Sequence, residues 1–435
     1  MLVKDLRRLA FVAGPLLVLL MLSATFWHLH TDPTVLRSQV GALLGNNPAR
    51  PKRPPPTANA THAEIYSSTK PDGKYYEVRF GSSIYNPNII PHPILKKTWF
   101  IVGQQWAEPR DPWDMKFEEV GCSAQLMGDV IMCIDFVRVM PYNPTKGDGC
   151  KGDSEFVNMN VGPHDARVFW GPQQPYTIYG SNSGFTCFGQ WVQDFRKLTG
   201  WEAEIPGTFD FQTDTELKRP APIAPFEKNY FLFWDAYDKM HAHYDIHPKR
   251  SFAQLELDDK GGPTGLSGAN LAPNSSDHDA RCMKRYLPTK LPKKVESIHQ
   301  ATNSLRITLC RRRDKNCKPK DDNTYIMTII QHKRYYNFHS EYEPYVVLFQ
   351  QRAPFELYAI SKRPLWIHGR KRIDEKKTEM FYVTSMNWKE KGKKYHGYLD
   401  DVLWMGFGIE DRYSGAMDVT AEELLEELGM CEGGQ

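Results

Sequence analysis

Asp165 and Arg167 form the most distinctive pair of chemically capable residues, two positions apart in G-P-H-D-A-R-V-F (162–169). In a β-strand, residues at this spacing point to the same side of the sheet. A nearby arginine keeps a carboxylate ionised, and it can also bind a sugar hydroxyl or a phosphate group. The pair therefore suggests acid–base chemistry on a sugar or phosphate substrate. The alternative is a structural ion pair at a strand edge.

A second polar cluster, Glu227, Lys228 and Asn229, directly precedes the apolar run Y-F-L-F-W. Carboxylate, ammonium and amide groups side by side suit the recognition of neighbouring sugar hydroxyls. The plainer interpretation of this cluster is a solvated turn.

Two further clusters contain groups suited to proton transfer. The first is H-G-Y-L-D-D (396–401), followed by Glu410 and Asp411, and the second comprises His332, Arg334, His339, Glu341 and Glu343. General acid–base catalysis on a sugar needs a carboxyl or imidazole group of tuned pKa in a partly dry pocket. The competing interpretation of both clusters is a polar turn.

The motifs of several other chemistries are missing from the sequence. It contains no G-x-S-x-G elbow, no Walker A loop and no C-x-x-C pair. The closest approach to the D-x-D motif of metal-dependent sugar transferases is D-F-Q-T-D (210–214). The histidines of H-A-H-Y-D-I-H (241–247) leave zinc open, but a structural or substrate-contacting role is favoured. We therefore expect no cofactor and no catalytic metal.

The elements that position these clusters are predicted to be short β-strands. Most of residues 75–411 consists of apolar runs rich in β-branched and aromatic residues, separated by Pro, Gly, Asn and Asp. This pattern argues against a doubly wound α/β fold and leaves a sandwich, a barrel or a propeller. Modules with a polar cluster followed by two strands recur five times and favour an all-β, five-bladed β-propeller: 86–103, 162–181, 227–248, 339–361 and 379–408. One amphipathic helix is predicted over 420–431.

The composition is that of a globular protein. Of the 435 residues, 41% are hydrophobic and 25% are charged, and the formal net charge is only +3. These values exclude extensive disorder, and the weak basic excess argues against a nucleic-acid partner.

The N-terminus predicts a single-pass membrane protein. Residues 9–27 carry no charge and would form a helix of about 28 Å, long enough to cross a bilayer. The excess of basic residues before this run indicates a cytoplasmic tail at 1–8, a signal anchor at 9–27, a Pro-rich luminal stem at 28–74 and a luminal catalytic domain at 75–435. A cleaved signal peptide is the alternative. The sequons at Asn59 and Asn274 agree with a luminal, Golgi location.

The eight cysteines favour disulfides in that compartment. We expect a loop-closing bridge between Cys310 and Cys317, which flank a basic run.

The blocks G-P-H-D-A-R-V-F, E-K-N-Y-F-L-F-W-D, Y-E-P-Y-V-V-L-F and Y-H-G-Y-L-D-D-V-L-W-M-G-F-G-I-E-D resemble those of the fungal β-mannosyltransferases. More distantly, the D-x-R and E-K-N segments resemble motifs of five-bladed propeller enzymes that act on β-mannosides, such as the mannoside phosphorylases. His164 and Ala166 stand where the phosphorylase block has Glu and Pro.

This resemblance implies a Golgi glycosyltransferase that moves a β-mannosyl unit, with GDP-mannose as donor and an oligosaccharide as acceptor. It implies Asp165 as the acid–base carboxylate, and Asp400 is the second expected catalytic residue. Cationic help for the departing diphosphate is assigned to Arg167, Lys228, His332 and Arg334. The expected ligands of sugar hydroxyls are Asn86, Asn229, Asp235, Glu343, Tyr398 and Asp401.

Two other functions remain open at this point. A glycoside hydrolase or phosphorylase on the same scaffold would need two carboxyl groups facing one bond, which Asp165 could form with Asp400 or Glu343. A non-catalytic carbohydrate-binding protein would keep the aromatic residues but would not depend on Asp165.

Overall fold

The computed structural model describes residue 56 and residues 60–431, apart from 108–112, 144, 208–209, 259–260, 268–275, 290, 293–294 and 375–376. The predicted tail, the anchor, most of the stem, Asn59 and Asn274 lie outside the described residues. In the part that is described, no helix has both the length and the apolar character that crossing a bilayer requires. The membrane topology and the Golgi location stay predictions.

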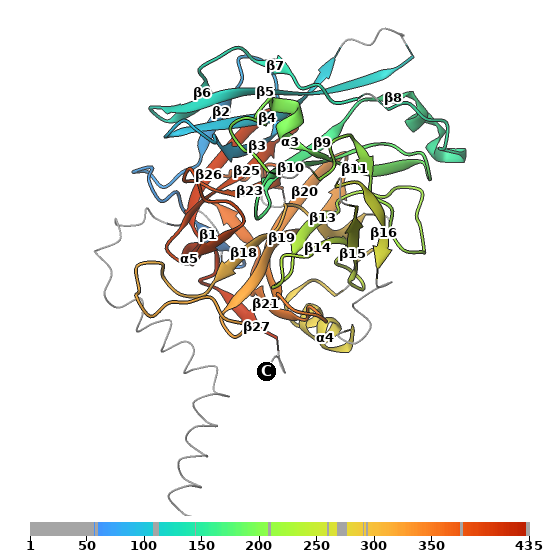
Figure 1. The fold of residues 1–435 in the computed structure, drawn as a ribbon. Coiled ribbons are helices and arrows are strands. Elements are labelled where there is room, and N and C mark those ends of the chain that lie inside the picture. Colours follow the sequence, from blue (N-terminus) through green and yellow to red (C-terminus); the bar gives the residue numbers. More distant parts are fainter. Residues whose placement is uncertain are drawn as a thin grey trace, which may run out of the picture. The chain divides into compact units, whose positions relative to one another are not determined.

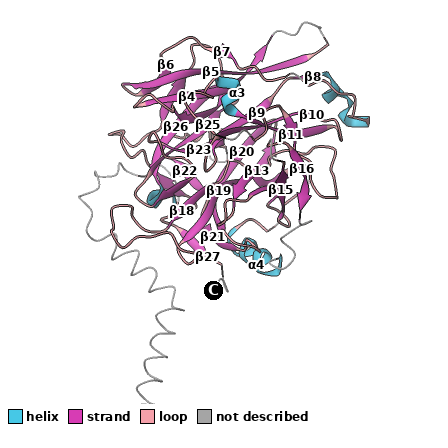
Figure 2. Ribbon diagram, viewed as in Figure 1, coloured by secondary structure: helices cyan, strands magenta, loops and turns pink. Residues whose placement is uncertain are grey.

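Strands dominate the described residues, which confirms the all-β expectation (Figure 2). Most strands pair antiparallel with strands close to them in the sequence, which gives five meanders (Figure 1). The first comprises β3 (Tyr85–Pro91), β4 (Thr98–Ala107), β5 (Met115–Met127) and β6 (Val130–Cys133). The second comprises β9 (His164–Trp170), β10 (Pro175–Asn182), β11 (Phe188–Asp194) and β12 (Thr215–Glu216). The third comprises β13 (Phe231–Trp234), β14 (Met240–Asp245), β15 (Ser251–Leu257) and β16 (Pro263–Ser267).

The last two meanders are extended by strands from elsewhere in the chain. The fourth comprises β17 (Glu296–Gln300), β18 (Leu305–Thr308), β19 (Thr324–Tyr336), β20 (His339–Gln350) and β21 (Leu357–Ser361), with β24 (His396–Tyr398) and β27 (Leu428–Met430) at its edges. The fifth comprises β23 (Phe381–Trp388), β25 (Val402–Ile409) and β26 (Tyr413–Thr420). The remaining elements are β1 (Ala63–Ile65), β7 (Arg138–Val139), β8 (Asn160–Val161), β22 (Leu365–Ile367), the 3₁₀ helix Gly152–Met159, α3 (Phe195–Thr199), α4 (Ser276–Tyr286) and α5 (Ala421–Leu424).

The early strand β2 (Tyr76–Arg79) joins the first meander to the last. It pairs antiparallel with β26 and parallel with β6, so these two meanders form one continuous sheet. Its residues alternate between buried and exposed, as expected of a strand with one face in the core, whereas β13 is buried throughout. This joining of the first and last meanders resembles the ring closure of a β-propeller.

Buried asparagines connect neighbouring meanders through their backbones. Asn88 on β3 donates to the carbonyl oxygen of Ala166 at 2.6 Å and accepts from the N–H of Val168 at 3.0 Å. The side chain of Asn387 on β23 likewise donates one hydrogen bond to the backbone of β9 and accepts another from it. The side chain of Asn303 forms the same pair of hydrogen bonds with the backbone of β23. These side chains satisfy backbone groups at strand edges that would otherwise be buried without partners. The strands β3, β9 and β23 are thereby held in fixed relative positions.

Two sequence expectations need correction. Residues 60–74, assigned to the stem, include β1, which pairs with β22, and Ser67, which donates to buried Asp418. The helix predicted over 420–431 is only α5, after which the chain forms β27 along β21. Pairing with an open strand edge outweighs the helical pattern there.

The expected bridge between Cys310 and Cys317 is confirmed. The other disulfides join Cys122 to Cys133, Cys150 to Cys187 and Cys282 to Cys431.

Candidate active site

The candidate site is a cavity of about 520 Å³ to which several meanders contribute. Its lining residues are Tyr85, Asn86, Gln104, Trp106, Asp165, Lys228, Asn229, Ser297, His299, Lys333, Tyr342, Tyr382 and Asp411. A smaller cavity of about 120 Å³ shares Asp165, Lys228 and Asn229 with it and is also lined by Arg167. The structure thus brings together five of the residues expected from the sequence: Asn86, Asp165, Arg167, Lys228 and Asn229.

Asp165 is held through both its side chain and its backbone. The side-chain amide of Asn86 donates to its carboxylate at 2.7 Å, and the Gln104 side chain accepts its backbone N–H at 2.7 Å. Arg167 donates to its carbonyl oxygen at 2.6 Å. The expected contact of Arg167 with the carboxylate is therefore replaced by a contact with the backbone. The carboxylate consequently has a fixed position in the pocket, which is the condition for efficient catalysis.

Four lining residues adopt a left-handed backbone conformation. Their φ angles are 55° at Asn86, 49° at Asp165, 63° at Asn229 and 47° at Asp411. This conformation is uncommon for residues other than glycine, although Asn and Asp tolerate it best, and it often marks functional sites. Three of the four lie at or just before the first strand of a meander, so the same local kink directs polar side chains into one cavity.

The cations of the pocket fall into two kinds. Arg167 is committed to the protein, because it also donates to the Ala301 carbonyl at 3.0 Å and to the Tyr382 hydroxyl at 2.8 Å. Lys228 and Lys333 form no ion pair with any carboxylate in the described part of the chain. Burial and the charge of Lys228 lower the pKa of the Lys333 amine. The cavity therefore contains two ammonium groups outside any close ion pair, and the carboxyl groups of Asp165 and Asp411 line the same cavity.

The two lining histidines are neutral at physiological pH. Burial and the charges of Lys228 and Lys333 lower the pKa of His299 to about 3. In the adjoining cavity, burial lowers the pKa of His164 to about 4. Both rings can therefore accept or donate a hydrogen bond as neutral imidazoles.

Asp411, in the turn between β25 and β26, is the second carboxylate of the pocket. Partial burial and the negative charges of Asp165 and Glu410 raise its pKa. Asp165 and Asp411 thus interact electrostatically, and Asp411 keeps its proton to a higher pH than an isolated aspartate. Asp411 follows the H-G-Y-L-D-D cluster in the sequence, but it was not among the predicted site residues.

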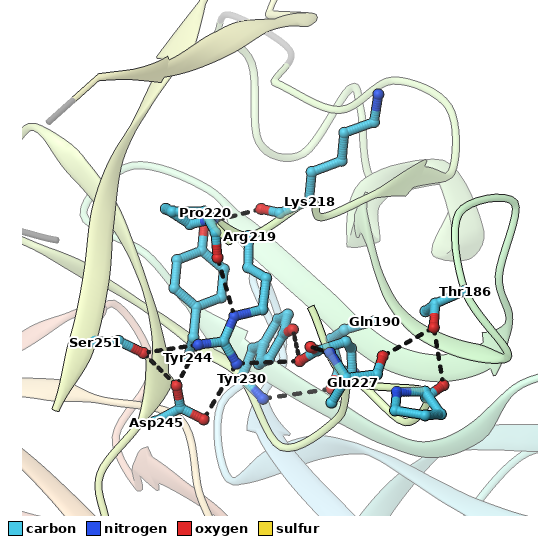
Figure 3. Close-up of polar contacts among 12 residues, drawn as sticks. Thr186, Gln190, Lys218, Arg219, Pro220, Glu227, Tyr230, Tyr244, Asp245 and Ser251 are labelled. Atoms are coloured by element: carbon cyan, nitrogen blue, oxygen red, sulfur yellow. Dashed lines mark hydrogen bonds and ion pairs between the residues drawn. The ribbon is translucent and has the colours of Figure 1, made fainter. Parts of the chain in front are cut away.

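The loop that presents Lys228 and Asn229 is anchored by a polar network (Figure 3). The guanidinium group of Arg219 lies between Glu227, at 3.2 Å, and Asp245 on β14. Tyr230 donates to Glu227 as well, and Ser251 donates to Asp245. Glu227, which was expected to contact substrate with Lys228 and Asn229, is therefore a structural residue.

Three expected ligands lie on the wrong face of the fourth meander. The facing residues Ser297, Lys333 and Tyr342 line the cavity, and their neighbours along each strand point to the opposite face. There His332 contacts Glu296 at 2.7 Å, Arg334 contacts Glu341 at 3.0 Å, and Glu343 contacts His62 at 2.8 Å. His332, Arg334 and Glu343, which were predicted to contact substrate, therefore lie outside both cavities, because residues adjacent along a strand point to opposite faces of the sheet.

The remaining expected residues also serve the fold. Asp401 is buried against Arg312 and Lys393, both at 2.6 Å, and Asp400 accepts the backbone N–H of Arg312. Tyr398 lies under the guanidinium group of Arg312. Asp400, Asp401 and Tyr398, which were predicted to act on the substrate, line neither of the two cavities.

Asp235 is likewise structural, and so are two of the histidines near it. The Asp235 carboxylate accepts the backbone N–H groups of Tyr237 and Lys239 and contacts His241 at 3.2 Å. His243 is buried among aromatic rings, and burial holds its pKa well below the usual range. Among the described residues, no cluster of His, Cys, Asp and Glu is arranged to hold a metal ion.

Neither a protein-family model nor a curated protein sequence matches the chain. Among solved structures, it is similar to the β-1,2-mannobiose phosphorylase from Listeria innocua, at 10% identity and a TM-score of 0.44, over 80% of this chain and 92% of that one. A glycosyl hydrolase from Bacteroides ovatus matches at 8% identity and a TM-score of 0.39, over 85% and 93% of the two chains. The catalytic domain of an α-L-arabinofuranosidase from Coprinopsis cinerea matches at 7% identity and a TM-score of 0.41, over 79% and 96%.

These structures are a phosphorylase and hydrolases rather than glycosyltransferases. The site differs from the expected transferase site as well, since His332 and Arg334, assigned to the leaving diphosphate, lie outside the cavity. The expectation of a GDP-mannose-dependent glycosyltransferase is therefore corrected.

Proposed function

We propose that this chain cleaves the glycosidic bond of a β-mannoside, and that its five meanders are the blades of a propeller around the pocket. The observation that carries the proposal is the electrostatic interaction of Asp165 and Asp411 across one cavity. Cleavage of a glycosidic bond commonly uses two carboxyl groups, one as proton donor and one as base or nucleophile. A cavity of about 520 Å³ also lies within the usual range of small-molecule sites, about 300–1,000 Å³.

The environments of the two carboxyl groups suggest their roles. Asp411, whose pKa is raised, protonates the glycosidic oxygen as the bond from that oxygen to the anomeric carbon breaks. Asp165, held by the amide of Asn86, accepts the proton of the water that forms the new bond to the anomeric carbon. The proton lost by Asp411 is thus balanced by the one gained by Asp165.

The choice of mannose rests on the sequence resemblance. Both blocks that resemble β-mannoside-active enzymes, 162–169 and 227–229, contribute lining residues to the same pair of cavities. Around them, Asn229, Tyr85 and Tyr342 offer amide and hydroxyl groups for the sugar hydroxyls.

Phosphorolysis is the second candidate, because Lys228 and Lys333 line the pocket and form no close ion pair with a carboxylate in the described residues. Ammonium groups can bind an inorganic phosphate ion through charge-assisted hydrogen bonds. In that case phosphate attacks the anomeric carbon, and the product is a sugar 1-phosphate.

The test uses the full-length protein, purified in detergent, with β-linked mannobiose and mannotriose in the presence and absence of inorganic phosphate. Free mannose without phosphate supports hydrolysis, and mannose 1-phosphate formed only with phosphate supports phosphorolysis. The Asp165→Asn variant should lose most of the hydrolysis, because it has no base for the attacking water. If the folded wild-type protein cleaves none of these substrates under either condition, the proposed function is wrong.

A further inference from the structure

Trp106, on β4, stands out among the residues that line the cavity. Its side chain is 61% exposed, although a tryptophan is normally largely buried. The residue therefore presents a flat apolar surface to solvent at the edge of the cavity. Exposed aromatic rings next to a pocket commonly mark ligand-binding surfaces.

The ring of Trp106 is connected to the candidate catalytic residue Asp165 through a row of packed aromatic rings. Phe117 lies opposite on β5, with ring centroids 4.3 Å apart, and it is almost fully buried. Phe117 in turn packs against His164, at 3.9 Å, whose ring contacts the Asn160 amide at 2.5 Å. Because His164 directly precedes Asp165, this row of rings fixes the indole relative to the carboxylate.

The other strongly exposed aromatic side chains in the described part of the chain do not share this position. Trp113 is 78% exposed, and Phe136 and Phe338 are also exposed, but none of them lines either cavity. Exposure and contact with the cavity thus coincide at Trp106, and Trp113 provides a matched control of the same residue type.

We propose that Trp106 forms an outer sugar-binding subsite, where its indole stacks on the face of a pyranose ring one or more units from the scissile bond. This inference rests on the proposed function, and it makes the substrate an oligosaccharide or polysaccharide rather than a simple β-mannoside. A pyranose ring has an apolar face of C–H groups that covers an indole well, and its hydroxyls remain at the rim in contact with water. The subsite adds affinity only for chains long enough to reach it.

The test measures the binding of β-linked mannooligosaccharides of two to six units by calorimetry, with the full-length Asp165→Asn variant so that no substrate is consumed. In this background the dissociation constant should fall as the chain lengthens. Adding Trp106→Ala should remove that gain and weaken binding of the longest chain about tenfold, with little change for the disaccharide. Adding Trp113→Ala should leave the length dependence intact.

The result that overturns the inference is a Trp106→Ala effect equal at all lengths, no effect at any length, or no binding of any oligosaccharide. Catalysis is measured separately in the wild-type background. If the wild-type protein cleaves nothing while Trp106→Ala abolishes the length-dependent binding, the proposed function fails and the sugar subsite stands. If cleavage occurs without length-dependent binding, the subsite fails and the proposed function stands.

Discussion

Gln104 and Glu119 face each other on β4 and β5, and they accept the backbone N–H groups of two consecutive residues, Asp165 and Ala166. This pair of side chains from the first meander thus holds the backbone of the second meander at Asp165, the residue with the left-handed conformation. The distances are 2.7 Å from Asp165 to Gln104 and 3.0 Å from Ala166 to Glu119. The other carboxyl oxygen of Glu119 is buried without a hydrogen-bond partner in the described residues.

Replacing Asp165 with Asn should lower the cleavage rate by about 10²–10⁴-fold, the usual contribution of general acid–base catalysis. The fold should be preserved, since Asn tolerates the left-handed conformation and can still accept the hydrogen bond from Asn86. The check is kcat with a β-mannoside substrate, with the thermal midpoint as the control for folding. Wild-type activity in the variant would contradict the assignment of Asp165.

Glu119 should make the protein less stable as the pH rises from about 5 to 8. Burial raises the pKa of Glu119 to about 8 in the folded state, above its value in the unfolded chain. The folded protein therefore binds the additional proton, so the free energy of unfolding falls with rising pH in this interval and levels off above it. Glu119→Gln mimics the protonated acid and should remove this part of the pH dependence.

The measurement is denaturant unfolding at pH 5, 6, 7 and 8 for the wild type and Glu119→Gln. Glu119→Ala is the companion variant, because it leaves the N–H of Ala166 without an acceptor and should cost about 1–3 kcal/mol at every pH. Parallel pH profiles for the wild type and Glu119→Gln would show that Glu119 does not titrate in this range.

Lys333 should affect the binding of phosphate as the acceptor, whereas its neighbour Arg334 should not. Lys333→Met removes one of the two unpaired ammonium groups of the pocket, while Arg334→Met changes a charge on the opposite face of β19. For a phosphorolytic enzyme, the KM for phosphate should rise about tenfold or more in Lys333→Met and stay near wild type in Arg334→Met. Equal effects of the two variants would argue against the face assigned to each residue.

Arg219 should act as a positioning residue for the loop that carries Lys228 and Asn229. Arg219→Met leaves Glu227 and Asp245 without their shared cation, and it should destabilise the protein by about 2 kcal/mol and raise KM more than it lowers kcat. Arg219→Lys restores the charge but not the forked contact, so it should recover stability in part. Steady-state kinetics with thermal unfolding separate these effects, and a fall in kcat at constant KM would contradict a positioning role.

Local patterns were sufficient for several features of this protein. The apolar runs predicted an all-β fold, because alternating and fully apolar segments favour strands regardless of distant contacts. The recurring polar clusters identified Asn86, Asp165, Arg167, Lys228 and Asn229, all of which line the two cavities. These residues lie where meanders begin, and the fold brings these parts of the chain together at the two cavities. Cys310 and Cys317 were predictable because a short loop keeps them close.

Other features depend on contacts between distant segments, which local composition does not encode. His332, Lys333 and Arg334 are adjacent polar residues, and only the pairing of β19 with β17 and β20 decides that Lys333 faces the cavity. The pKa of Asp411 is raised by burial and by Asp165, a residue far away in the sequence, and the pKa of Glu119 is raised by burial. The segment 428–430 has helical periodicity, yet the free edge of β21 makes it a strand. Strand register and burial are set by the packing of the whole chain, and these two quantities determine which side chains line the cavity.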